Sequence, residues 1–389
     1  MTANSEPKIP LWRDERFWKI ALQVLAVVAA IGLITLLWNN VIVNMRNKGI
    51  KFGFDFLQTQ ASFFIQESLI PYNPSQDPYS RVLLIGLLNS IRIIIPGIIL
   101  ATLLGILAGT ISFSGNWLLR KVSQVYVEII RNTPLLLQLL FWYFAVFSQF
   151  PDRDSPLSFL GSIFASKQGT FVPWPAINGN FWLWLGVLII LAIAAFFLFR
   201  QRTKLMVEKG ASGQPQLYSL IAIALVSLLI FIFALGWQFP QKNAAGAVEG
   251  GLRLSIEYSA LLLGLVVYTG AYIAEIVRAG IQSVSKGQWE AARALGLHQM
   301  STLRLVVFPQ ALRVMIPPLN SQYMNIAKNS SLAIAIGYVD FYSVSNTTYN
   351  QTGRPVEVML IIMVVYLTID LLISVAMNTL NKFVQLQER

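Results

Sequence analysis

Long uninterrupted runs of apolar residues constrain this chain more than any other feature. Several of them reach the roughly 20 residues that a helix needs to cross the hydrocarbon core of a membrane. With 55% hydrophobic and only 12% charged residues, the chain carries about half the charge of a typical soluble domain. The sequence therefore predicts an all-α integral membrane protein.

The apolar runs predict about eight crossings. We expect them at residues 20–38, 82–111, 134–150, 181–199, 217–239, 256–279, 305–327 with 331–344, and 356–380. The seventh is one crossing with a break, because polar residues interrupt it at 328–331. We interpret the first run as a retained span, since its apolar core is too long for a signal peptide and no small-residue cleavage site follows.

The basic residues indicate the orientation of these spans. If the N-terminus lies inside, the inner segments carry about twice as many Lys and Arg residues as the outer segments, as the positive-inside rule requires. We therefore expect both termini to be cytoplasmic. The net charge of +11 follows from this topology and needs no nucleic-acid partner.

The residues that most enzymes need are scarce or missing. The chain has no cysteine, and His298 is its only histidine, which excludes thiol chemistry and a histidine-built metal site within one chain. A P-loop and a Gly-x-Ser-x-Gly nucleophile elbow are absent as well. The sequence predicts no catalytic residue, no bound metal and no cofactor in this chain.

The inner segment after the sixth predicted crossing contains a short helix candidate at residues 285–296. Residues 288–295 are good helix formers, and Gly296 suits a left-handed C-terminal cap. Such a short helix is marginal in water, so a docked partner would stabilise it. Small side chains beside Glu290 and Arg293 let another protein approach closely.

The pattern of Glu290, Ala291, Ala292 and Gly296 resembles the E-A-A…G coupling loop of ATP-binding-cassette (ABC) importer permeases. Further segments resemble the polar amino acid permease family in the family's order: VEIIRNTPLLLQ at 127–138, AYIAEIVRAG at 271–280, GQWEAA at 287–292, FPQALR at 308–313 and KNSSL at 328–332. With its extra spans, the chain is most similar to the larger permease subunit of bacterial general L-amino acid importers.

This resemblance divides the chain into four parts. They are an N-terminal tail, extra span and outer loop (1–81), the first part of the permease core (82–150), an insertion with two spans (151–250), and the second part of the core (251–389) with the coupling loop at 285–297. Two added spans leave the orientation of the core unchanged. Within the outer loop, residues 50–70 are a candidate interfacial helix.

The resemblance also implies partners. It implies a homologous second permease, favoured as a different chain, two cytoplasmic ABC ATPases that bind ATP and Mg, and a periplasmic amino-acid-binding protein. The location would be the bacterial inner membrane, in contact with lipid. The ATPase would be contacted by Gln288, Glu290, Ala291, Ala292, Leu295 and Gly296. The alternative is that these residues form only a solvated loop helix.

Polar residues at membrane depth are the candidates for the substrate site. Gln322, Asn325 and Asn329 fall on roughly one helical face, and Ser330 and Ser331 follow at the predicted break. Polar side chains there are costly unless they face protein or water, and transporters build substrate sites where a span breaks. They predict contact with a neutral or mixed set of L-amino acids. Alternatively, they satisfy one another.

Charged and glycine residues elsewhere in the spans admit simpler interpretations. Arg92 attracts a substrate carboxylate or, equally, forms a structural pair with Glu128 or Glu257. Glu275 and Arg278 can bond one turn apart. Gly105-x-x-x-Gly109 permits close helix contact.

The predicted function is that of a permease subunit in an ATP-driven importer of L-amino acids, forming half of the pathway. The alternative is a self-sufficient secondary amino acid transporter or channel, for which the E-A-A loop would be incidental.

Overall fold

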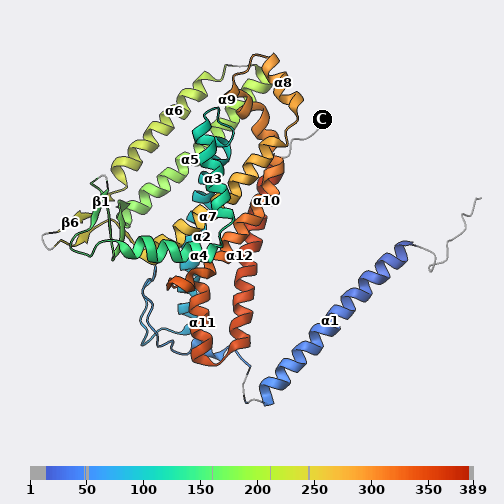
Figure 1. Cartoon of the computed structure of the whole chain (residues 1–389), viewed down its shortest axis with the longest axis vertical. Helices are drawn as coiled ribbons and strands as arrows, with labels where there is room; N and C mark the ends of the chain where they lie inside the picture. The colour runs from blue at the N-terminus through green and yellow to red at the C-terminus, as the bar shows by residue number, and fades with distance from the viewer. Residues whose placement is uncertain are drawn as a thin grey trace, which may run out of the picture.

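The computed structural model describes residues 15–47, 49, 52–159, 161–210, 212–243 and 246–384, most of them in helices. The predicted N-terminal tail before residue 15 and the residues after 384 lie outside the described part. Figure 1 shows an elongated bundle with α8 (Lys286–Ala294) at one end and α11 (Phe341–Thr352) at the other.

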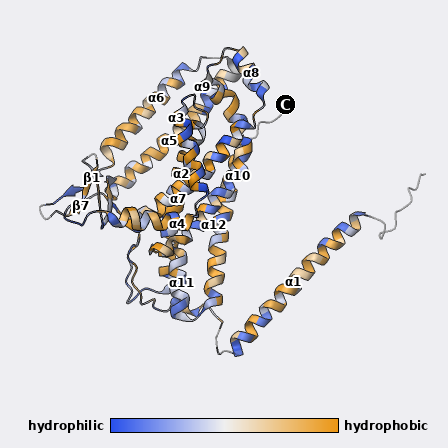
Figure 2. Cartoon of the chain, in the orientation of Figure 1, coloured by the Kyte–Doolittle hydropathy of each residue, from blue (hydrophilic) through white to orange (hydrophobic). Residues whose placement is uncertain are grey.

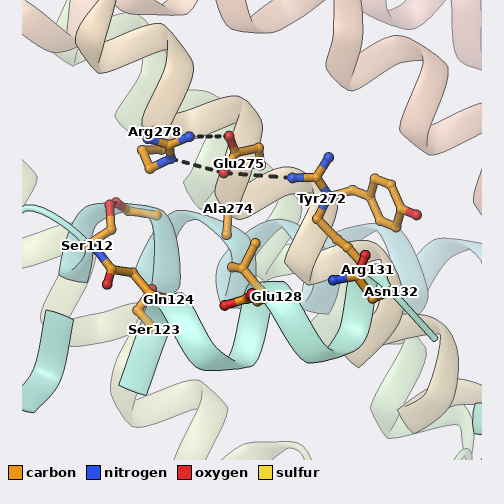
Figure 3. A pocket seen from close by; sticks show the side chains of 12 residues that line it. Ser112, Ser123, Gln124, Glu128, Arg131, Asn132, Tyr272, Ala274, Glu275 and Arg278 are labelled. Atoms are coloured by element: carbon orange, nitrogen blue, oxygen red, sulfur yellow. Dashed lines mark hydrogen bonds and ion pairs between the residues drawn. The ribbon is translucent and has the colours of Figure 1, made fainter. Parts of the chain in front are cut away.

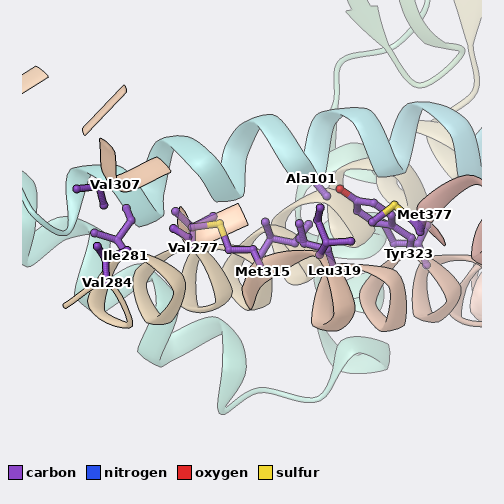
Figure 4. Packing of buried hydrophobic residues seen from close by; sticks show 13 residues of the cluster. Ala101, Val277, Ile281, Val284, Val307, Met315, Leu319, Tyr323 and Met377 are labelled. Carbon is purple, nitrogen blue, oxygen red and sulfur yellow. The ribbon is translucent and has the colours of Figure 1, made fainter. Parts of the chain in front are cut away.

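Four long helices form the centre of the bundle. They are α2 (Tyr79–Ile111), α7 (Ile256–Gln282), α10 (Phe308–Asn329) and α12 (Pro355–Val384). Helix α7 packs against both α2 and α10, and α10 packs against α12. Buried apolar side chains from all four meet in one cluster, which includes Ala101, Ile273, Met315 and Met377 (Figure 4).

Two glycines of α2 permit its close approach to α7. A Cβ atom on Gly105 would lie 2.4 Å from Ile273 Cγ2, and one on Gly109 would lie 2.7 Å from the Ala274 carbonyl oxygen. Real Cβ contacts are longer than this, so only glycine fits at either position. The predicted role of this glycine pair in close helix contact is confirmed.

Fewer helices are apolar enough to span a membrane than the eight crossings predicted from the sequence. Among the described residues, six helices are long and apolar enough to cross a membrane, and a bent helix pair brings the number to seven. That pair is α3 (Trp117–Arg131) with the segment Leu135–Gln149, and the two parts meet at 106°. The predicted third crossing at 134–150 therefore omitted α3. Helix α10, predicted as part of the seventh crossing, is too polar to meet the hydropathy criterion.

The bend after α3 has a local cause. Asn132, Thr133 and Pro134 separate α3 from α4 (Leu135–Leu140), which continues through the π-helical η3 (Phe141–Val146) into η4 (Phe147–Gln149). The Gln138 amide donates to the carbonyl oxygens of Ile130 and Thr133, at 2.9 and 3.0 Å. The bond to Thr133 satisfies an acceptor at the break, and the bond to Ile130 adds to the one that the Thr133 amide donates there.

The insertion forms a helical hairpin with a small β region. The hairpin consists of α5 (Gly179–Lys209) and α6 (Gln214–Leu229), and α6 continues into η5 (Ile230–Ala234). Four strands form an antiparallel sheet in the order β1-β2-β3-β8: Leu157–Phe159, Ile163–Ser166, Gly169–Val172 and Leu252–Leu254. Two further pairs join β4 (Trp174–Pro175) to β5 (Trp237–Gln238) and β6 (Gln241–Lys242) to β7 (Val248–Glu249). The two helices were predicted from the sequence, whereas none of the strands was.

Helix α1 (Glu15–Asn47) lies apart from the bundle in Figure 1, and no residue of its most apolar stretch is buried. Figure 2 shows apolar residues along most of α1, α5 and α6. Such exposed apolar helices suit lipid as their surroundings.

The segment 52–78 between α1 and α2 is not the predicted interfacial helix. Its described residues contain only one short helical stretch, η2 (Asp55–Gln58), followed by turns and irregular chain. The Tyr72 hydroxyl donates to the Phe63 carbonyl oxygen at 2.7 Å. Burial, together with the nearby Asp77 carboxylate, raises the pKa of Tyr72, so this hydroxyl keeps its proton. Apart from η2, the segment therefore folds through contacts such as this hydrogen bond and does not form a helix.

Candidate functional site

A polar pocket of about 450 Å³ lies between α3 and α7 (Figure 3). Its wall contains charged, amide and hydroxyl side chains together with Gly109 of α2. The lining residues are Gly109, Ser112, Ser123, Gln124, Val127, Glu128, Arg131, Asn132, Tyr272, Ala274, Glu275 and Arg278. A cavity of this size can enclose a small solute.

Helix α3 presents its polar face to this pocket. Gln124, Glu128 and Arg131 are four and then three residues apart, so they share one side of the helix. The opposite side exposes apolar residues, among them Val122 and Ile129. This division is typical of a helix that separates a polar cavity from lipid.

Two hydroxyl groups hold α3 in place. Ser123 Oγ donates to the Ala108 carbonyl oxygen of α2 at 2.7 Å, and Tyr126 donates to the Val267 carbonyl oxygen of α7 at 2.7 Å. Asn116 caps the start of α3 by accepting from two backbone amides. The polar face of α3 is thus fixed at both neighbouring helices.

The charges in the pocket alternate in sign. Arg278 Nε donates to Glu275 Oε2 at 3.0 Å, and a second guanidinium nitrogen of Arg278 contacts the other carboxylate oxygen. Arg131 lies 3.9 Å from Glu275 Oε2, and its guanidinium stands 5.3 Å from the ring centroid of Tyr272. The predicted bond between Glu275 and Arg278 is confirmed.

Glu128 and Arg131 are the pocket charges with the fewest partners. Within the described part of the chain, Glu128 forms no ion pair, and the single ion pair of Arg131 is long, at 3.9 Å. One free carboxylate and one loosely held guanidinium can bind an ammonium and a carboxylate group, respectively. The arrangement is therefore complementary to a zwitterion.

From the sequence, Glu128 was considered only as an alternative partner of Arg92, and Arg131 was given no role beyond the motif at 127–138. Glu275 and Arg278 were interpreted as a structural pair. The available signal was the helical spacing of polar residues at 124, 128 and 131, just before a Pro-containing break. That spacing indicates a polar helix face within an otherwise apolar region.

The predicted substrate residues of α10 do not line this pocket. Gln322, Asn325 and Asn329 lie on α10, which ends at Asn329 and passes into the 3₁₀ segment η7 (Ser330–Ile336), so the predicted break is confirmed. Buried Ser330 donates to the Ala327 carbonyl oxygen at 2.7 Å, and Ser331 donates to the Lys328 carbonyl oxygen at 2.6 Å.

One face of α10 is polar and exposed. Ser321, Asn325 and Lys328 are spaced by four and three residues along it, and Lys328 Nζ lies 3.1 Å from Asp370 Oδ2 of α12. Polar side chains at membrane depth require water or protein around them. This face is therefore suited to a pathway or to a partner chain.

Arg92 lies among structural partners. Its Nη1 is 3.1 Å from Glu67 Oε2 of the 52–78 segment, and its guanidinium lies 4.6 Å from the Tyr258 ring centroid. The ion-pair partner is thus Glu67 and not Glu128 or Glu257 as expected. This geometry favours the structural alternative for Arg92.

The predicted helix at 285–296 is confirmed as α8, with Gly296 at φ 69° as its left-handed end. Ala292 is buried, whereas Glu290 and Ala291 are exposed and the Leu295 side chain is 79% exposed. Gln288 Oε1 accepts from Gln310 Nε2 of α10 at 3.2 Å. One side of helix α8 therefore packs on the bundle, and the other side is exposed at the end of the bundle.

Comparison with known proteins adds the family. The model of the binding-protein-dependent transport system inner membrane component matches residues 216–385. The chain is 43% identical over 371 residues to "Putative amino-acid ABC transporter permease protein YhdX" of Escherichia coli, covering 94% of each. It is 40% identical to the general L-amino acid transport system permease protein AapQ of Rhizobium johnstonii, covering 97% of this chain and 94% of that protein.

A third relative is the glutamate/glutamine/aspartate/asparagine transport system permease protein BztB of Rhodobacter capsulatus, 38% identical over 97% of this chain and 96% of that protein. The solved structure described as "Crystal structure of an amino acid ABC transporter with histidines" matches with a TM-score of 0.47 and 20% identity, covering 78% of this chain and 94% of that one.

These relatives align over nearly the whole chain, including the insertion. They confirm the predicted type I importer permease fold, the multi-pass membrane location and the non-catalytic role, in which ATP hydrolysis lies in a partner ATPase. The chain belongs to the family of amino-acid ABC transporter permeases.

Proposed function

We propose that this permease forms half of the pathway of an ATP-driven importer of L-amino acids, and that its substrate passes the pocket between α3 and α7. The observation that carries the proposal is that the pocket holds both an unpaired carboxylate, Glu128, and a loosely held guanidinium, Arg131. Glu128 is suited to the ammonium group and Arg131 to the carboxylate that all amino acids share. Recognition of these shared groups supports a broad or neutral substrate range.

The polar face of α10 would continue the pathway. Gln322, Asn325 and Asn329, with Ser331 at the break, would line it opposite a second, homologous permease. Buried Ser330 would hold the break through its bond to Ala327 and not face the pathway. We favour a different chain as that partner. A periplasmic binding protein would deliver the amino acid at the α11 end, which we assign to the outside.

Coupling would run through α8 and α7. Helix α7 ends at Gln282 and α8 begins at Lys286, so the pocket residue Glu275 and the exposed Glu290 lie on adjoining helices. Docking of a cytoplasmic ATPase on Glu290, Ala291, Leu295 and their neighbours would move α8, and the rigid α7 would carry that movement to the pocket. ATP and Mg would be bound by the ATPase alone.

Reconstitution tests this proposal. The chain is purified with candidate ATPases and a second permease, and amino-acid-stimulated ATP hydrolysis is measured in liposomes with the binding protein present. Glu290→Arg should abolish the stimulation, because it reverses the charge on the docking surface. Glu249→Arg, a matched change at an exposed carboxylate of β7, should preserve it.

The alternative function gives a different result. A secondary transporter would take up amino acids as a purified single chain without ATP, and Glu290→Arg would leave that uptake unchanged. Such uptake would refute the proposed function.

A further inference from the structure

The segment 52–78, here named the outer strap, binds the ends of two helices that are distant in sequence. The backbone amide of Gly53 donates to Glu357 Oε1 of α12 at 2.9 Å, and Asp55 lies 3.5 Å from Arg354. At the junction of the strap with α2, the Tyr79 hydroxyl donates to Gln351 of α11 at 2.9 Å. The strap therefore connects α2 to the turn between α11 and α12.

Glu67 joins the strap to α2 by an ion pair. Its carboxylate is 3.1 Å from Arg92 Nη1, and the two side chains are only 21% and 18% exposed. Arg92 also stacks on Tyr258, whose hydroxyl donates to the Arg92 carbonyl oxygen at 3.1 Å. A charge in this position is costly without its counter-ion. Glu67 is therefore required to neutralise Arg92.

The backbone of Glu67 is held in the same place. Buried Asn89 donates from Nδ2 to the carbonyl oxygens of Glu67 and Val339, at 3.0 and 2.8 Å. The Tyr338 hydroxyl donates to the Asn89 carbonyl oxygen at 3.2 Å. One asparagine thus joins the strap to the residues that directly follow η7.

The chain between η7 and α11 is held by packing and by further hydrogen bonds. Tyr338 is buried against Tyr258, and Asp340 caps α11 by accepting from the Ser343 amide. Gly337 turns it with φ 80°, and the amide of Phe341 is bound by Ser90 Oγ of α2 at 3.0 Å. Its hydrogen bonds to α2 include those of Asn89 and Ser90, which lie three and two residues before Arg92. Movement of α2 away from the strap would release both the ion pair and these hydrogen bonds.

We propose that Glu67 is a positioning residue for the broken helix: through Arg92 and Asn89 it holds the outer strap, α2 and the residues after η7 as one unit at the outer end of the pathway. The inference uses the proposed function only to assign this end to the outside. A strap held in this way keeps the break in one conformation while the α8 end of the bundle moves.

The absence of cysteine allows a direct test. Ala333→Cys places a single thiol at a buried position of η7, where labelling requires opening, and its reaction rate with a membrane-impermeant maleimide is measured in the full chain in lipid nanodiscs. Adding Glu67→Gln should raise the rate about tenfold, the shift in opening equilibrium that a loss of ~1.4 kcal/mol produces. The charge swap Glu67→Arg with Arg92→Glu should return the rate to within about twofold of the original.

Controls separate positioning from general damage. Glu249→Gln, the same change at a distant exposed carboxylate, should leave the rate unaltered. If Glu67→Gln loses its cooperative thermal transition, the double variant Glu67→Gln with Arg92→Gln takes its place. The double variant removes both charges and should still label faster than the chain with Glu67 and Arg92 intact. An unchanged rate in folded Glu67→Gln, or a swap that fails to restore it, would overturn the inference. The labelling needs neither ATPase nor amino acid, so failure of the proposed function would not affect it.

Discussion

The close contact between α2 and α7 predicts that Gly105→Ala destabilises this protein. The new Cβ would lie 2.4 Å from Ile273 Cγ2 and 2.5 Å from Ile273 Cβ, whereas ordinary contacts begin at 3.4 Å. The two helices must therefore separate by about 1 Å, the difference between 3.4 and 2.4 Å. Rotation of the Ile273 side chain cannot relieve the clash, because its Cβ is fixed to the backbone.

The cost follows from the packing around Ile273. This side chain is fully buried in the cluster shared by α2, α7, α10 and α12, so separation of α2 and α7 loosens all four helices. Overpacking of a well-packed core costs about 1–3 kcal/mol, and we expect a loss of about 2 kcal/mol here. Because Ile273 lies two residues before Glu275, the pocket should also change shape and uptake should slow.

The assay is reversible unfolding in mixed micelles, followed by circular dichroism. Gly186→Ala in α5 is the matched control, since a Cβ there meets nothing within 4 Å. That change should be neutral or stabilising by about 0.5–1 kcal/mol, because alanine favours a helix over glycine. Equal or greater stability of Gly105→Ala than of the wild type would refute the packing argument.

Three further predictions follow from the pocket, the α10 pair and α8. Arg131→Gln should raise the half-saturation concentration for uptake at least tenfold, because a charge-assisted hydrogen bond contributes about 1.5–3 kcal/mol. Lys121→Gln, on the same helix but outside the pocket, should leave that concentration unchanged. Equal effects of the two variants in a liposome uptake assay would contradict the assigned site. Lys328→Gln should reduce the free energy of unfolding by about 1–2 kcal/mol, because it leaves Asp370 unpaired near α10. Adding Asp370→Asn to the same chain should restore most of this stability. Chemical unfolding measures both variants, and a double variant less stable than the single one would exclude this explanation. Leu295→Asp should leave the free energy of unfolding of the isolated chain within about 0.5 kcal/mol of wild type, because this side chain is exposed. The same variant should no longer co-purify with the ATPase. Retention of the complex would show that Leu295 is not part of the docking surface.

Local sequence was sufficient where the structure depends on residues close together in the chain. The membrane spans were predictable because each must bury its own backbone hydrogen bonds and expose apolar side chains to lipid. The helix at 285–296 and the pairing of Glu275 with Arg278 were predictable for the same reason, since caps and one-turn pairs join near neighbours. The bend after α3 was missed, although Pro134 marks it.

The pocket and the partner of Arg92 required the tertiary structure. Glu128 and Glu275 reach one pocket only because α3 packs on α7, although the whole insertion separates these helices in sequence. Glu67 meets Arg92 because the strap folds back as irregular chain, and irregular chain has no periodicity from which its path can be read. In the insertion, β8 likewise joins the sheet only by pairing with β3, which is distant in sequence.

The sequence by itself determined that this protein is a multi-span membrane helix bundle with a coupling helix, because hydropathy and short-range patterns specify those features residue by residue. Only the tertiary structure decided which charges face one another. Ion pairs and pockets form between surfaces that meet through helix packing, and that packing depends on glycine contacts and buried side chains from all parts of the chain at once.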